Sequence, residues 1–144
     1  MNGFSNIGPI RLAGLLCSLV LLSACATGTV KSVSPENSIE ERAVKRWEVL
    51  LSGDLAGAYE YLSPAYRTSV SSLQYQRSVL MKKVAWTSAD YMGSVCDETT
   101  CTVKNNVGFT AYGVVPGVKS YKGIQQIEES WVLVDGQWYL VPGK

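Results

Sequence analysis

The residues of this chain that could do chemistry are few, because its 144 residues include four cysteines and no histidine. The missing histidine excludes Ser-His-Asp and Cys-His catalysis as well as histidine-ligated metals. An acid–base enzyme would have to use Asp, Glu, Tyr or Lys instead. We expect neither a metal nor a cofactor, and an enzymatic role stays open but is not favoured.

Cys25 closes the stretch Leu22-Ser23-Ala24-Cys25, which follows Arg11 and an apolar run that begins at Leu12. A positive residue, an apolar segment and small residues at the end are the three parts of a secretory signal. A membrane-spanning helix is the alternative, but the 13 residues from Leu12 to Ala24 fall short of the roughly 20 needed to cross a bilayer. Residues 1–24 are therefore predicted to be a signal peptide.

The four residues ending in Cys25 resemble the lipobox of bacterial lipoprotein precursors, whereas Cys17 follows bulky Leu16 and does not fit that pattern. The resemblance implies cleavage before Cys25 and a diacylglycerol, with acyl chains such as palmitate, on its sulfur. Ala26, rather than Asp, after the cysteine goes with sorting to the outer membrane, facing the periplasm. An ordinary cleaved signal with an incidental cysteine is the alternative. Residues 25–37 are polar and aperiodic, and we interpret them as a flexible tether.

The other two cysteines, Cys96 and Cys101, are separated by four residues that are typical of a turn. In an exported protein whose other cysteines are removed or lipidated, two such thiols predict a disulfide. A redox pair is the alternative, although the spacing is not C-x-x-C.

Pairing Cys96 with Cys101 also sets a strand register in which the numbers of opposing residues sum to 197. Because side chains alternate along a strand, this register places Asp90 on the same face as four apolar residues, provided that no bulge intervenes. They are Trp86, Met92, Val107 and Phe109. A carboxylate among such neighbours is a candidate base in a pocket; with a bulge, Asp90 would be an ordinary polar residue.

The elements that must position these residues are helices followed by strands. A capping box at Ser38 to Glu41 predicts a helix to about Ser52, with a charged face that includes Arg46 turned to water. Asp54 is expected to cap a second, shorter helix, and Ser63-Pro64 is expected to start another turn with Pro in the first helical position. Ser71 or Ser72 is expected to cap a third helix, which runs to about Lys83 and turns Leu73, Gln76, Val79 and Leu80 inward.

Strands are predicted from Val84 onward, with the glycine-rich residues 112–123 as a loop or a bent strand edge. That loop lacks the phosphate-binding motif G-x-x-x-x-G-K. Asp135 and Gly136 predict a type I′ turn. This turn would pair Leu133 with Trp138 and Trp131 with Leu140 on one face.

This order of helices and strands, ending in the Ser130 to Leu140 hairpin, resembles the NTF2-like (cystatin-like, SnoaL-like) superfamily over roughly residues 38–142. The resemblance implies an α+β fold, a cone in which N-terminal helices pack on a curved antiparallel sheet. Residues 38–144 are assigned to this domain. Some relatives are enzymes that use an Asp base, and others bind small ligands, dimerise or belong to envelope assemblies.

Two functions follow as hypotheses. The favoured one is a membrane-anchored envelope lipoprotein with a non-catalytic binding or assembly domain and an envelope protein or peptide as partner. The alternative is a ligand-binding or acid–base enzymatic cone with Asp90 in its pocket. A homodimer through the outer sheet face (Val132, Val134, Tyr139 and Val141) is a further possibility. The chain has 13 basic residues, including Arg11 in the leader, and 12 acidic ones, a balance that argues against nucleic acid as a partner.

Overall fold

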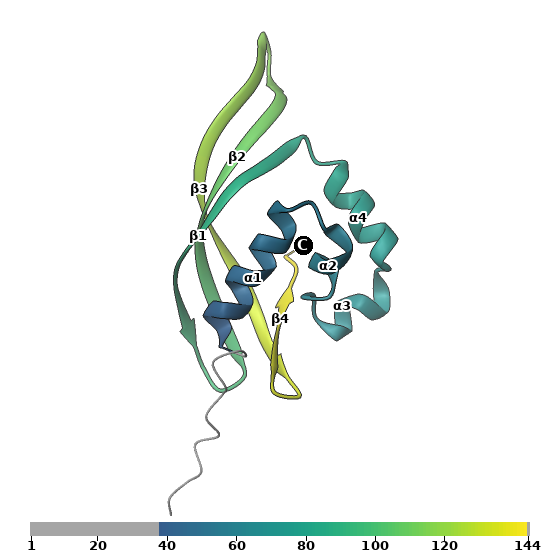
Figure 1. Ribbon diagram of the computed structural model, residues 1–144, viewed down its shortest axis with the longest axis vertical. Coiled ribbons are helices and arrows are strands. Elements are labelled where there is room, and N and C mark those ends of the chain that lie inside the picture. Colours follow the sequence, from purple (N-terminus) through teal and green to yellow (C-terminus); the bar gives the residue numbers. More distant parts are fainter. Residues whose placement is uncertain (1–37, 144) are drawn as a thin grey trace, which may run out of the picture. The chain divides into compact units, whose positions relative to one another are not determined.

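The structure is a computed structural model that describes residues 38–143. Four helices come first, α1 (Ile39–Leu51), α2 (Leu55–Tyr59), α3 (Pro64–Ser69) and α4 (Ser72–Leu80). Four strands follow, β1 (Val84–Cys96), β2 (Thr100–Val115), β3 (Val118–Val134) and β4 (Gln137–Val141) (Figure 1). Cys25 and the predicted tether lie outside the described residues. No helix within residues 38–143 combines the length and apolar character of a membrane span.

Each helix begins at a polar residue that caps it, and the segment predicted as a turn after Ser63-Pro64 is the short helix α3. The Ser38 hydroxyl accepts the Glu41 N–H at 3.1 Å, and an Asp54 carboxylate oxygen accepts the Gly57 N–H at 2.8 Å. Ser63 caps α3 ahead of Pro64, and Ser71 forms a complete capping box at the start of α4. Such caps satisfy backbone donors that the first helical turn leaves free.

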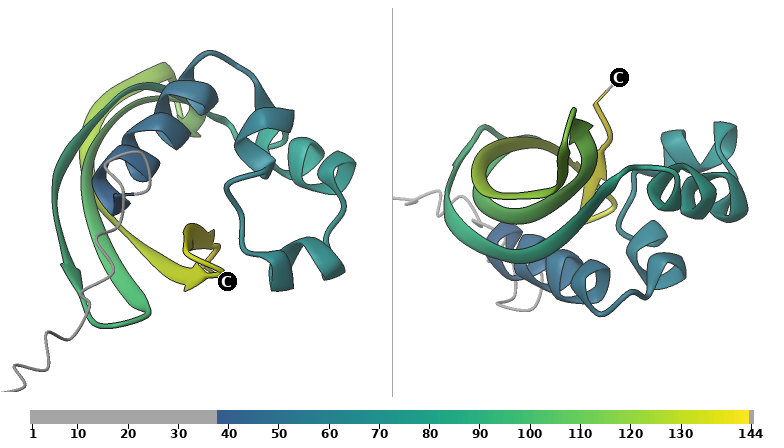
Figure 2. Two further views of the ribbon diagram at one scale, coloured as in Figure 1. Left: turned by 60° about the horizontal axis from the view of Figure 1, so that its bottom comes forward. Right: turned by 90° about the horizontal axis from the view of Figure 1, so that it is seen from above.

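The four strands form one antiparallel sheet in the order β1-β2-β3-β4. The sheet curves strongly, and α1 lies along its concave face (Figure 2). The core fills the space between them, where Ala43, Trp47 and Leu50 of α1 meet buried residues of the strands. Those strand residues are Val103, Val107, Trp131, Trp138 and Leu140.

The β3–β4 hairpin has the predicted turn and register. Asp135 and Gly136 both have positive φ, 51° and 81°, as a type I′ turn requires. Leu133 pairs with Trp138 and Trp131 with Leu140. The free edge of β4 is covered, because the Leu140 N–H donates to the Tyr61 carbonyl and the Ser63 N–H donates to the Leu140 carbonyl, each at 2.8 Å.

Of the two alternatives for residues 112–123, the loop is wrong, because β2 and β3 continue through this stretch as strands of a long two-stranded ribbon. The ribbon projects beyond the rest of the sheet, where β1 and β4 no longer flank it (Figure 1). Only Pro116 and Gly117 lie between the two strands. Gly123 remains compatible with a strand and lets the Phe109 ring approach, since a Cβ there would lie 3.0 Å from Phe109 Cζ.

Candidate functional site

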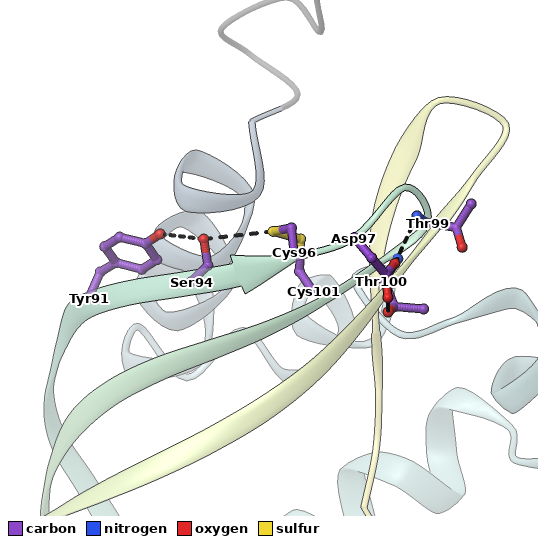
Figure 3. Close-up of a disulfide and its surroundings, with 7 residues drawn as sticks. All are labelled: Tyr91, Ser94, Cys96, Asp97, Thr99, Thr100 and Cys101. Atoms are coloured by element: carbon purple, nitrogen blue, oxygen red, sulfur yellow. Dashed lines mark hydrogen bonds between the residues drawn. A yellow bond between two sulfur atoms is a disulfide. The ribbon is translucent and has the colours of Figure 1, made fainter.

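The turn between β1 and β2 carries the predicted disulfide, Cys96–Cys101 (Figure 3). The Asp97 carboxylate closes the same turn by accepting the Thr99 N–H at 3.2 Å, the Thr100 N–H at 2.8 Å and the Thr100 hydroxyl at 2.9 Å (Figure 3). The hydrogen bonds from Thr100, followed by that from Thr99, lower the pKa of Asp97 below its ordinary value. The disulfide and Asp97 therefore act together to fix the hairpin.

The register that placed Asp90 in the core is wrong beyond Gly93. Opposing residues sum to 197 from Cys96 to Gly93, but two bulges then shift the pairing, one between Tyr91 and Gly93 and one between Trp86 and Ser88. Asp90 faces Asn106 instead of Val107 and is exposed. Met92 is 54% exposed, and Tyr91 takes the inner position opposite Asn105.

The two bulges explain why only some of the residues predicted to share the inner face of the sheet lie there. Each bulge adds one residue to β1 and so turns the following side chains to the other face of the sheet. One bulge separates Asp90 from the disulfide, whereas two bulges separate Trp86 from it, so Trp86 returns to the inner face opposite Phe109. Gly108 permits the second bulge, since a Cβ there would lie 2.5 Å from the Ser88 hydroxyl.

A cavity of about 400 Å³ opens on the concave side of the sheet between α1, α4 and β3. Arg46 and Trp47 line it from α1, Tyr75 from α4, and Glu129 from β3. The residues that follow β4, Pro142 and Gly143, also line it. Two further hollows, of about 120 and 300 Å³, are smaller. This cavity holds the buried charges of the described part of the chain, Arg46 and Glu129.

Arg46 and Glu129 form a buried ion pair beside this cavity, in contrast to the prediction that Arg46 faces water. Arg46 Nη1 donates to Glu129 Oε1 at 2.6 Å. Glu129 Oε2 accepts from Trp47 Nε1 at 3.2 Å and from Asn105 Nδ2 at 3.1 Å. The carboxylate thus has three donors, whereas the buried Nε of Arg46 has no acceptor among residues 38–143.

Tyr75 is the residue of α4 that faces this network. It is buried, whereas Leu73 and Leu80, which were expected to face inward, are 65% and 74% exposed. Burial raises the pKa of the Tyr75 phenol above its ordinary value of 10.0, and the charge and hydrogen bond of Arg46 oppose that rise. The phenol is therefore neutral near pH 7 and available as a hydrogen-bond donor.

A second, smaller hollow of about 120 Å³ adjoins the cavity at Trp86. Three of the residues predicted for a pocket, Trp86, Val107 and Phe109, line it, and Asp90 and Met92 do not. Trp86 packs edge-on against Trp47, with 6.0 Å between the ring centroids. The two hollows thus give the concave face a polar part around Arg46 and an apolar part around Phe109.

The sequence contained a signal for the ion pair. Arg46 lies three residues after Ala43 and four before Leu50, so it falls on the buried stripe of α1. Glu129 lies two residues before Trp131 and so shares the inner face of β3. Two opposite charges on surfaces that must pack together indicate a buried pair.

No group of three His, Cys, Asp or Glu side chains able to hold a metal occurs within residues 38–143.

The outer face of β4 is less free than the dimer hypothesis assumed. Val132, Val134 and Tyr139 are half-buried. The guanidinium carbons of Arg42 and Arg67 lie 5.7 Å and 5.8 Å from the centre of the Tyr139 ring. The homodimer stays a prediction.

Comparisons with known proteins give a likeness of fold. No protein-family model matches the chain, and no curated protein matches it. The solution structure of a SEC-C motif containing protein from Rhodopseudomonas palustris is similar, with a TM-score of 0.58 and 16% sequence identity over 75% of this chain and 78% of that one. Helices followed by an antiparallel sheet are common to both. The predicted α+β fold, with N-terminal helices packed on a curved antiparallel sheet, is confirmed.

Proposed function

We propose that the protein is a lipid-anchored bacterial envelope protein whose cone-shaped domain binds a ligand or partner and catalyses no reaction. The observation that carries the non-catalytic part is the environment of Glu129, the one buried carboxylate among residues 38–143. Its oxygens already accept hydrogen bonds from Arg46, Trp47 and Asn105. A general base needs a free lone pair directed at the substrate proton, and three of the roughly four acceptor positions of this carboxylate are already taken.

Asp90 gives the enzymatic alternative no support, because its side chain is exposed and on the opposite face of β1 from the cavity. The cavity itself supports binding, since it combines buried polar groups with aromatic walls. Its lining includes Arg46, Tyr75 and Trp86.

The anchoring part of the proposal is supported by the lipobox-like residues that end at Cys25, which lie outside the described residues. A diacylglycerol there would hold the domain in the envelope, at the outer membrane facing the periplasm. The partner would be an envelope protein or peptide within reach of the tether. A tether of about 12 residues spans at most ~40 Å when fully extended.

Complementation of a deletion strain with a measurable envelope phenotype tests both parts. Cys25→Ala is expected to abolish complementation, whereas Cys17→Ala, a change in the same leader, is expected to preserve it. Asp90→Asn, a change on the opposite face of β1 from the cavity, is expected to complement at normal protein levels, which immunoblots check. A Cys25→Ala variant that complements fully, or an Asp90→Asn variant that is stable but inactive, would contradict the proposal.

A further inference from the structure

Arg46 is a buried cation with unused hydrogen-bonding capacity. Its side chain is nine-tenths shielded, and only Nη1 donates to Glu129. A guanidinium carries five N–H donors, and the buried Nε finds no acceptor within residues 38–143. Because Arg46 lines the cavity, a ligand that offers acceptor oxygens to its Nη donors would be favoured at this end, whereas the Nε itself is sealed from solvent.

The charges around the cavity leave one cation uncompensated. Arg46 is paired with Glu129, and Glu128 is paired with Lys104 at 3.2 Å. Lys82 lines the same cavity and takes part in none of the ion pairs found between residues 38 and 143. Its Nζ lies 5.7 Å from the centre of the Trp86 ring, at the boundary with the apolar hollow. This one surplus positive charge, on Lys82, therefore favours a ligand group with a single negative charge.

The other side of Trp86 is apolar. Val84, Val107, Phe109 and Ile127 line the smaller hollow. A third hollow of about 300 Å³, lined by Leu50, Leu55 and Leu80 among others, also includes Trp86 and Val84. Leu80 and Met81, just before Lys82, are 74% and 76% exposed. An aliphatic chain that covered these surfaces would be stabilised by the hydrophobic effect.

We infer that the concave face binds an amphiphile with a carboxylate head and an aliphatic chain. The carboxylate lies between Lys82 and the free donors of Arg46, where Tyr75 can donate to it. The chain runs past Trp86 over Val84 and Phe109. This inference rests on the proposed function, because it names the ligand class of the same binding domain.

Photocrosslinking of the full chain in phosphatidylcholine vesicles tests the inference. The probe is hexadecanoic acid with a diazirine in its chain, and the matched neutral probe is the corresponding diazirine hexadecanol. Peptide mass spectrometry is expected to map the acid probe to β1 and β2 residues around Trp86 and Phe109. The acid is expected to label them about fivefold more than the alcohol does, as one favourable charged contact permits.

Two variants separate head-group recognition from general adsorption. Lys82→Glu is expected to reduce labelling by the acid about fivefold and to leave labelling by the alcohol unchanged. Lys45→Glu makes the same charge change on the exposed side of α1, away from the cavity. It is expected to leave labelling by the acid and labelling by the alcohol unchanged. Circular dichroism checks that both variants fold.

Any of three results would overturn the inference. They are equal labelling by the acid and the alcohol, labelling outside the concave face, and labelling of Lys82→Glu by the acid at the native level. These failures are distinguishable from failure of the proposed function. If labelling fails while Cys25→Ala still abolishes complementation, the ligand class alone is wrong. If Cys25→Ala complements fully, the anchoring proposal is wrong whatever the groove binds.

Discussion

Arg46 Nη1 lies 2.6 Å from Glu129 Oε1, so that a charged hydrogen bond joins α1 to β3 inside the cone. The exposed fractions of the two side chains are 9% and 8%. Bringing two ions out of water is costly, and such a pair is tolerated only while both members are present. The pair therefore fixes the position of α1 on the sheet at the place where the cavity opens.

Removal of one member of this pair should destabilise the domain strongly. Glu129→Ala leaves the Arg46 charge buried and unpaired, which costs about 3–5 kcal/mol of unfolding free energy. The double variant Arg46→Met, Glu129→Met removes both charges and should recover most of that loss. Urea denaturation followed by circular dichroism measures both variants.

The exposed pair Lys45–Glu48 on the same helix provides the matched control. Glu48→Ala should cost no more than about 1 kcal/mol, because exposed pairs contribute little. A Glu129→Ala variant that is as stable as Glu48→Ala would show that the buried pair does not hold α1 in place.

Alkaline pH should weaken the fold through Tyr75. Burial raises its folded-state pKa above 10.0, the ordinary value that it regains on unfolding. The neutral phenol therefore contributes stability that is complete below about pH 10 and is lost as the pH rises toward the folded-state pKa. The free energy of unfolding, measured with urea between about pH 8 and 11, should fall more steeply with pH for the native chain than for Tyr75→Phe. Tyr121, which is 54% exposed, gives the control, since Tyr121→Phe should keep the native slope.

The hairpin disulfide should stabilise the domain modestly, because it closes a short loop. A sequence separation of 5 corresponds to about 2 kcal/mol of unfolding free energy in the loop-entropy model. Reductant should lower the urea midpoint of the native protein accordingly and should leave a Cys96→Ser, Cys101→Ser variant unaffected. Intact masses with and without reduction should differ by two hydrogens. Two free thiols in protein taken from its own compartment would contradict the assignment.

The turn between β3 and β4 should require glycine at position 136. Its φ of 81° is unfavourable for any residue with a Cβ, so Gly136→Ala should cost about 1 kcal/mol. Gly143, whose φ is not positive and which has open space around it, is the matched control. Thermal unfolding that shows equal midpoints for Gly136→Ala and Gly143→Ala would contradict the assignment of the turn.

Features that depend on local sequence could be predicted, including the helix caps at Ser38 and Asp54 and the Asp135-Gly136 turn. In each case a few neighbouring residues decide the conformation. The disulfide belongs to the same class, because the spacing of Cys96 and Cys101 and an expected export signal were sufficient to predict it. The order of helices and strands was also sufficient to indicate the fold class.

Features that depend on distant partners could not be predicted with the same rules. The position of Asp90 depended on the bulge at Met92. That of Trp86 depended also on the bulge at Thr87, which Gly108 on the neighbouring strand permits. The burial of Arg46 depended on Glu129, 83 residues away in sequence. Taken alone, Arg46 and Glu129 would each be expected to be exposed, since charged residues are rarely buried without a partner.

The central claim is that a lipid on Cys25 holds this binding domain at a bacterial membrane. Mass spectrometry of the amino-terminal peptide, from full-length protein produced in bacteria and purified from membranes, tests it most directly. The account predicts a mature chain that begins at Cys25 and carries the mass of a diacylglycerol on that residue, with Cys96 and Cys101 unlipidated. A chain that begins elsewhere, or a Cys25 without lipid, would contradict the claim.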